Sequence, residues 1–119
     1  MSQSFAYDQE TIVLAGSDAV NVFGSNGAVV PATETLLATY TAVGNALLKY
    51  VYASGETDGR FKLYVNSTAI WIDRNAWTER NIQSQLEKKL VTGDIVELKV
   101  TNLKLTNHFF SGGFYVYKL

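Results

Sequence analysis

Hydrophobic and polar residues alternate along much of the second half of the chain, which is the pattern of strands with one buried and one exposed face. The alternation is clearest over residues 60–66 and 94–101. Polar or charged residues occupy most positions between the hydrophobic ones, so one face of each strand is predicted to line a core. The residues predicted to face inward are Phe61, Leu63, Val65, Val96, Leu98 and Val100.

Other short β-prone runs, separated by glycine, asparagine and other turn residues, fill most of the chain. Their spacing of about 8–12 residues gives roughly eight strands, and no strong helix pattern interrupts them. This succession predicts an all-β fold, an antiparallel β-sandwich or barrel around one core. Besides the two runs above, the predicted strands cover residues 36–43, 47–53, 68–73 and 113–119.

Residues 78–90 fit two structures. Ile82, Leu86 and Leu90 recur every four residues, which suits one face of a helix, but they also share the parity of one strand face. Because the surrounding segments are β-prone, we expect an extended or irregular segment, and a helix is the alternative.

The first 33 residues differ from the rest because their β-prone runs are shorter. Asn26-Gly27 divides two of these runs, and Asn-Gly tolerates the positive φ that tight hairpin turns need. Pro31, the single proline, closes the region. The sequence therefore predicts an N-terminal arm of small hairpins over residues 1–33 and a β-sandwich domain over residues 34–119.

Composition narrows the classes of function. A chain of 119 residues suits one domain, and 47% hydrophobic with 18% charged residues argues against disorder. The net charge is −1 without any charge run, so we expect no nucleic-acid partner and no membrane. The absence of cysteine excludes disulfides and thiolate metal sites. The first residues lack the features of a signal peptide, so we expect synthesis in the cytoplasm.

Both tryptophans and two of the three arginines lie within residues 70–81, IWIDRNAWTERN. If Ile70 and Ile72 face inward, Trp71 and Trp77 lie outside or at an edge. Exposed tryptophan and arginine are enriched at protein interfaces, whereas self-packing on the sheet and stacking of a sugar ring are the alternatives. The predicted contact residues of this hairpin are Trp71, Arg74, Trp77 and Arg80.

No arrangement of residues in the sequence indicates catalysis or a cofactor. The turn at residues 55–59 offers two carboxylates where calcium takes six to eight oxygens. His108, the single histidine, has no serine in a nucleophile-elbow context. The sequon at residues 66–68 matters only in a secretory pathway. We therefore expect a non-enzymatic protein without a metal or cofactor site.

The order of motifs over residues 34–119 is similar to that found in a known group of proteins. A strand over 34–43 is followed by a strand ending in Ser-Gly-Glu at 54–56, then by GRFKLYVN at 59–66 and the arginine-bearing hairpin. The segments LVTGDIVELKVTN and FSGGF complete the order. This succession resembles the small jelly-roll virion proteins of tailed bacteriophages. Some of those are capsid decoration (cement) proteins, and others sit on tails or fibres.

The resemblance implies a jelly-roll-like sandwich with a structural role in the virion, where the partner is the major capsid protein or another virion protein. It also implies a homo-oligomer, for which we expect a trimer. The N-terminal arm is then the predicted anchor, adding strands to an exposed sheet edge, unless its strands complete the chain's own sandwich. A second hypothesis is a carbohydrate- or receptor-binding module of a tail or fibre, with Trp71 and Trp77 as its platform. The predicted anchor residues are Val20, Val22, Phe23, Val29 and Val30.

Overall fold

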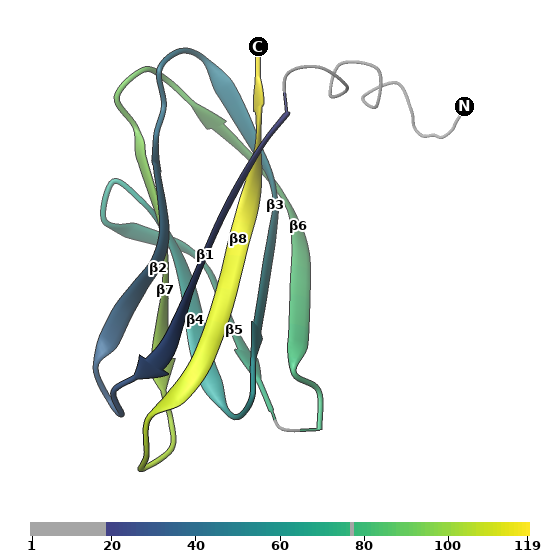
Figure 1. Cartoon of the computed structure of the whole chain (residues 1–119). Helices are drawn as coiled ribbons and strands as arrows, with labels where there is room; N and C mark the ends of the chain where they lie inside the picture. The colour runs from purple at the N-terminus through teal and green to yellow at the C-terminus, as the bar shows by residue number, and fades with distance from the viewer. Residues whose placement is uncertain (1–18, 77) are drawn as a thin grey trace.

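The computed structural model describes residues 19–76 and 78–119, which form eight β-strands in two four-stranded antiparallel sheets. The sheets have the strand orders β1-β8-β3-β6 and β2-β7-β4-β5 and pack face to face (Figure 1). The strands are β1 (Ala19–Val29), β2 (Glu34–Thr41), β3 (Ala46–Gly55), β4 (Gly59–Val65), β5 (Thr68–Asn75), β6 (Asn81–Leu90), β7 (Ile95–Asn102) and β8 (His108–Lys118).

This strand order is that of a jelly roll. Of the connections between the described strands, only β4 to β5 stays within one sheet, and all the others cross to the opposite sheet. Such crossing interleaves the two halves of the chain, so both sheets depend on strands from distant parts of the sequence. The prediction of an all-β, jelly-roll-like antiparallel sandwich of about eight strands is confirmed.

The core lies between the two sheets and follows the predicted alternation. All six residues that the pattern placed inward are buried, with at most 6% of their surface exposed. Burying a side chain of this size contributes about 1.5–3 kcal/mol, so the two strands with the clearest pattern supply much of the core's stability. The largest fully buried side chains are Phe61, Phe110, Phe114, Leu48, Leu63, Leu90 and Leu98.

Residues 81–90 form strand β6, as the favoured interpretation predicts, and the helical alternative is wrong. Ile82 and Leu86 are half-buried against the core, and Leu90 is fully buried. Their shared strand parity, rather than helical spacing, explains the pattern, because β6 pairs with β3 from Asn81 to Leu90 with one irregularity between Gln85 and Lys88. No helix in the described part of the chain is long and apolar enough to cross a membrane.

The prediction of separate hairpins in the N-terminal region is wrong for residues 19–29. These residues form one strand that pairs with β8, and Asn26-Gly27 lies in an irregularity of this pairing instead of forming a hairpin turn. Pairing along β8 satisfies the backbone groups on one side of the edge strand β1, so tertiary structure overrides the local turn preference. Strand β1 therefore completes the chain's own sandwich. Residues 1–18 of the predicted arm lie outside the described residues.

Glycine at position 24 lets β1 pass close to β2 at this edge of the sandwich. A Cβ atom added to Gly24 would lie 1.7 Å from the carbonyl oxygen of Leu37, a distance that no side chain can occupy. The glycine is therefore required by the close approach of two backbones.

The predicted facing of residues 70–73 is also wrong in part. Trp71 lies opposite buried Leu63 and packs against the core, whereas Ile72 lies on the outer face and is 59% exposed. The cause is an irregularity in the β4–β5 pairing, where Ile70 is an extra residue. One extra residue inverts the parity of the positions that follow it.

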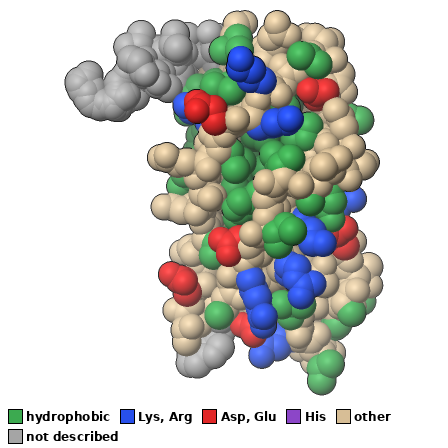
Figure 2. Space-filling view, turned by 180° about the vertical axis from the view of Figure 1, so that it is seen from behind, with side chains coloured by type: hydrophobic (Ala, Val, Ile, Leu, Met, Phe, Trp, Pro, Cys, Tyr) green, Lys and Arg blue, Asp and Glu red, His purple; other side chains and the backbone are tan. Residues whose placement is uncertain are grey.

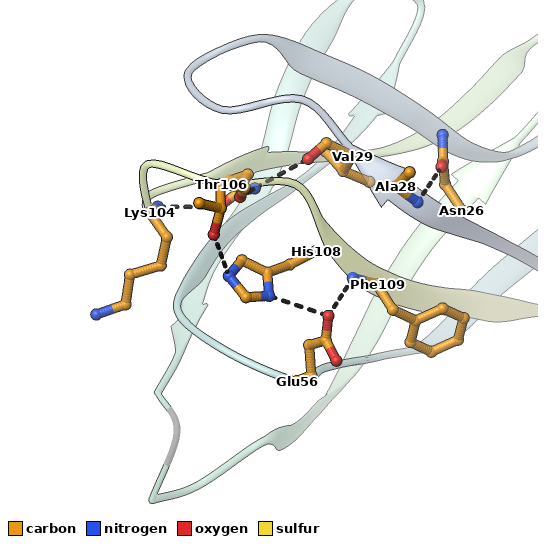
Figure 3. A network of polar contacts seen from close by, with 9 residues as sticks. Asn26, Ala28, Val29, Glu56, Lys104, Thr106, His108 and Phe109 are labelled. Carbon is orange, nitrogen blue, oxygen red and sulfur yellow. Dashed lines mark hydrogen bonds and ion pairs between the residues drawn. The ribbon is translucent and has the colours of Figure 1, made fainter.

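A network of polar contacts ties the loops together at one end of the sandwich (Figure 3). Asn102, which is 1% exposed, donates from Nδ2 to the carbonyl oxygens of Val29 and Thr106 at 2.9 and 2.8 Å, and its Oδ1 accepts from the backbone N–H of Lys104. The buried amide thus fixes the β7–β8 loop against the end of β1. Such a fully satisfied buried amide makes the loop a rigid part of the fold.

Candidate binding faces of the sandwich

The residues predicted as an N-terminal anchor do not form one exposed surface. Val29 is buried in the core, Val22 packs against the core, and Val20 is half-buried. Only Phe23 and Val30 are exposed, to 58% and 53%. The sequence-based set therefore divides into core residues and two surface residues, of which Phe23 belongs to the aromatic surface described below.

The residues predicted in the hairpin are also divided. The ring of Trp71 is half-buried against the core, which matches the self-packing alternative. Arg74 and Arg80 are exposed, and the carbonyl oxygen of Arg80 accepts a hydrogen bond from Asn75. Trp77 lies outside the described residues. Because Trp71 is partly buried against the core, only part of its surface is open to a partner.

The outer face of the β1-β8-β3-β6 sheet instead carries four aromatic rings in mutual contact. Tyr50 and Tyr52 alternate with buried residues of β3, Tyr115 lies beside them on β8, and Phe23 adjoins them on β1. Neighbouring ring centroids are 5.9–6.4 Å apart, and the rings of Phe23 and Tyr52 stack nearly parallel, at 11°. Contacts at these distances favour a rigid cluster. We call Phe23, Tyr50, Tyr52 and Tyr115 the tyrosine face.

Hydrogen bonds and a glycine fix the orientation of these rings. The hydroxyl of Tyr52 donates to Oδ1 of Asn21 at 2.7 Å, and that of Tyr50 donates to Oε1 of Gln83. A Cβ atom at Gly113 would lie 2.6 Å from the Tyr52 hydroxyl oxygen, so glycine allows this ring to lie across β8. Burial raises the pKa of Tyr52, which keeps its hydroxyl protonated and able to donate.

A hollow of about 440 Å³ opens beside the tyrosine face, at the edge formed by β6. None of the side chains that line it is formally charged. A neighbouring hollow of about 470 Å³ shares part of this wall but also includes Asp73, Arg74 and Glu79. The first hollow is lined by Tyr50, Tyr52, Ala53, Ser54, Asn81, Ile82, Gln83 and Tyr115.

The outer face of the other sheet carries a basic patch. On β4, Arg60 lies directly opposite Arg74 of β5, and Lys62 lies directly opposite Lys99 of β7. Figure 2, seen from behind, shows Lys and Arg side chains gathered in the lower half of the view. Like charges placed opposite each other in a sheet repel and lower stability. We call Arg60, Lys62, Arg74 and Lys99 the basic face.

Acidic side chains do not neutralise this basic face by direct ion pairs. Among the described residues, no carboxylate lies within 4.0 Å of the charged nitrogens of Arg60, Lys62, Arg74 or Lys99. The ammonium of Lys99 lies 5.1 Å from the ring centroid of Tyr64. The surface therefore holds cations whose attraction is available to a partner.

Two apolar side chains flank the basic face. Leu36 lies opposite Lys99, and Ile72 lies opposite Lys62. The lysine pair is thus bracketed by side chains that are 46% and 59% exposed. The face is basic at its centre and apolar at its sides, which suits a partner with both acidic and apolar groups.

Acidic residues on this sheet engage Tyr64 instead of the basic face. Glu34 accepts a hydrogen bond from the hydroxyl of Tyr64 at 2.6 Å, and Glu97 lies opposite Tyr64 on β7. The hydrogen bond to Glu34 raises the pKa of Tyr64 to about 12. The hydroxyl therefore stays protonated near neutral pH and continues to donate to Glu34.

The carboxylate of Glu56 is held by a backbone N–H and by a histidine side chain. Its Oε2 accepts from the backbone N–H of Phe109 at 2.9 Å and lies 3.0 Å from Nδ1 of His108 (Figure 3). The Nε2 atom of His108 lies 3.0 Å from the hydroxyl of Thr106. The N–H of Phe109 and then His108 hold the pKa of Glu56 below its ordinary value. His108 thus joins the β3–β4 turn to the start of β8.

The lowered pKa of Glu56 predicts a loss of stability in acid. Because the folded chain holds the carboxylate below its ordinary pKa of 4.5, its stabilisation is complete above that value. The contribution is lost as the pH falls through the folded-state pKa. The variant Glu56→Gln keeps the shape of the side chain but removes its charge. Its free energy of unfolding is therefore expected to fall less between neutral and acid pH than that of the parent chain. Urea unfolding at about pH 6 and about pH 3 measures both changes, and equal losses would contradict the prediction.

Comparisons with known proteins do not assign a family. No family model matches the chain, and no curated protein matches it. Among solved structures, the chain is similar to part of the insecticidal delta-endotoxin Cry8Ea1 from Bacillus thuringiensis, with 10% identity and a TM-score of 0.42. It is also similar to part of dimeric latent PorU from Porphyromonas gingivalis, with 8% identity and a TM-score of 0.41. Each match covers 86% of this chain but only 20% and 13% of those proteins, so the chain spans a fifth of their length or less.

Sequence reasoning named one residue of each face, Phe23 and Arg74, but identified neither face as a site. For the tyrosine face a signal was present, because Tyr50 and Tyr52 have the opposite parity to Val51 and Ala53, which are buried. Two aromatic residues in a row on an outward face indicate an unusual surface. The basic face had no comparable signal, because its residues come from three strands whose register the sequence does not give.

Proposed function

We propose that this chain is a non-enzymatic structural protein of a bacteriophage particle, a capsid decoration protein that binds the assembled head. The motif order over residues 34–119 supports this proposal through its resemblance to small jelly-roll virion proteins. The strand order of the two sheets is in keeping with that resemblance. A decoration protein stabilises a shell because its binding free energy is added only in the assembled state.

The basic face is the single observation that carries a docking role. Two like-charged cross-strand pairs, Arg60 with Arg74 and Lys62 with Lys99, have no carboxylate within 4.0 Å among the described residues. An acidic partner surface removes their mutual repulsion on binding, while the two flanking apolar side chains add contact area. We therefore assign the partner as an acidic, partly apolar patch of the major capsid protein or another virion protein.

The proposed arrangement repeats over the particle. A head presents many copies of the same acidic patch, so weak individual contacts act together when several chains are linked as a homo-oligomer. A trimer is the state we propose.

Binding of the purified chain to heads that lack it tests the proposal. Heads and chain are mixed and sedimented, and the bound chain is measured against the major capsid protein. We expect saturable binding to assembled heads that weakens with salt, because exposed charges are screened. A chain that remains in the supernatant at every concentration would overturn the proposal.

A tail or fibre module that binds carbohydrate or a receptor is the second candidate. The observation that favours it is the tyrosine face with its uncharged hollow. In that case the particle would hold only a few to a few dozen copies, and the chain would not bind purified heads.

A further inference from the structure

We propose that the hollow beside the tyrosine face binds a neutral oligosaccharide. This inference concerns the sheet opposite the basic face, so it holds whether the chain is attached to a head or to a tail. The volume of the hollow, about 440 Å³, lies within the range of small-ligand sites, about 300–1,000 Å³. The ligand class follows from the side chains that line the hollow.

The aromatic rings match the apolar face of a sugar. A pyranose ring presents C–H groups on its faces and hydroxyls around its rim, so it stacks on an aromatic ring and forms hydrogen bonds at the edge. Tyr50, Tyr52 and Tyr115 lie beside one another at 5.9–6.4 Å between centroids and at interplanar angles of 36–76°, so they offer a sugar several ring faces and edges at different tilts. Their contacts and hydrogen bonds hold them in place before a ligand arrives, which reduces the entropy lost on binding.

The rim of the hollow supplies uncharged hydrogen-bonding groups. Gln83 uses its Oε1 to accept from Tyr50, and its amide N–H groups have no partner among the described residues. The side chains of Ser54 and Asn81 also line the hollow without a side-chain partner in the described part of the chain. Amide donors and hydroxyl groups at the edge of aromatic rings match the alternating donors and acceptors of sugar hydroxyls.

The absence of charged side chains from the lining of the hollow indicates which class of glycan it would bind. The lining of the hollow has no arginine or lysine to pair with a carboxylate or sulfate, and the charged residues Asp73, Arg74 and Glu79 belong to the neighbouring hollow. An acidic sugar would lose hydration without gaining an ion pair. A neutral sugar carries no charge to desolvate, so the site fits neutral oligosaccharides.

The full chain is tested on an array of neutral gluco-, manno- and galacto-oligosaccharides together with sialylated and sulfated glycans. We expect retention on one neutral series and at least a roughly tenfold loss of affinity in Tyr52→Ala. Tyr64→Ala is the matched control, because Tyr64 is a half-buried tyrosine on the outer face of the other sheet. Its binding is expected to equal that of the parent chain. Gln83→Ala, on an exposed position of β6, provides a second variant if Tyr52→Ala does not fold.

Three results would overturn the glycan proposal. The first is that no neutral glycan retains the chain, and the second is that binding survives both Tyr52→Ala and Gln83→Ala. The third is a dimer in analytical ultracentrifugation that Tyr52→Ala dissociates while no glycan binds, because the face is then an interface between copies. Since the array uses the isolated chain, none of these results depends on its place in a particle.

Discussion

Replacing Phe110 by alanine is expected to lower the free energy of unfolding by about 3–5 kcal/mol. The Phe110 ring is fully buried and contacts Phe61 edge-to-face, with centroids 5.9 Å apart. Cβ atoms added at Gly55 and Gly59 would lie 2.3 and 2.6 Å from this ring, so two glycines leave space for it. Alanine would leave a cavity between backbones that are held in sheets and do not collapse into it.

The neighbouring phenylalanine provides a matched control for this experiment. Phe109 is 42% exposed on the same strand, so Phe109→Ala removes the same atoms but less buried contact than Phe110→Ala. Urea or guanidinium unfolding of the three chains measures the difference. A similar loss of stability in both variants would contradict the assignment of Phe110 to the core.

Reversing two charges of the basic face, with Arg60→Glu and Lys62→Glu together, is expected to reduce affinity for assembled heads about 100-fold. Both side chains lie on the outer face of β4, so the change does not touch the core. The variant presents carboxylates to an acidic partner, so electrostatic repulsion replaces the attraction that the parent chain provides. Co-sedimentation with heads over a series of concentrations measures the shift.

The control for charge reversal carries the same net charge. Lys89→Glu with Lys118→Glu changes two exposed lysines on the other sheet, away from the basic face. We expect its binding to differ little from that of the parent chain. Equal losses in the two double variants would mean that net charge, and not the basic face, governs attachment, which would contradict the docking assignment.

Strict alternation in the sequence was sufficient to predict the central strands of the fold. Phe61, Leu63 and Leu98 are fully buried, as their alternation with polar neighbours predicts. The signal is local, because every second side chain of a paired strand meets the core whatever the register. Residues 81–90 were likewise predicted correctly, since the β-prone segments around them favour a strand.

The remaining features depend on pairing between distant strands, which local patterns do not give. The facing of Trp71 and Ile72 was predicted wrongly because Ile70 is an extra residue opposite β4, and a sequence carries no direct signal for such an irregularity. The hairpin at Asn26-Gly27 was predicted wrongly because β1 pairs with β8 along nearly its whole length. The two candidate faces likewise bring together residues from three strands each.

Copy number in purified particles tests the central claim most directly. Quantitative mass spectrometry compares the amount of this chain with that of the major capsid protein in particles from the source. A decoration protein on the head predicts a near-stoichiometric ratio. Absence of the chain from purified particles would contradict the account.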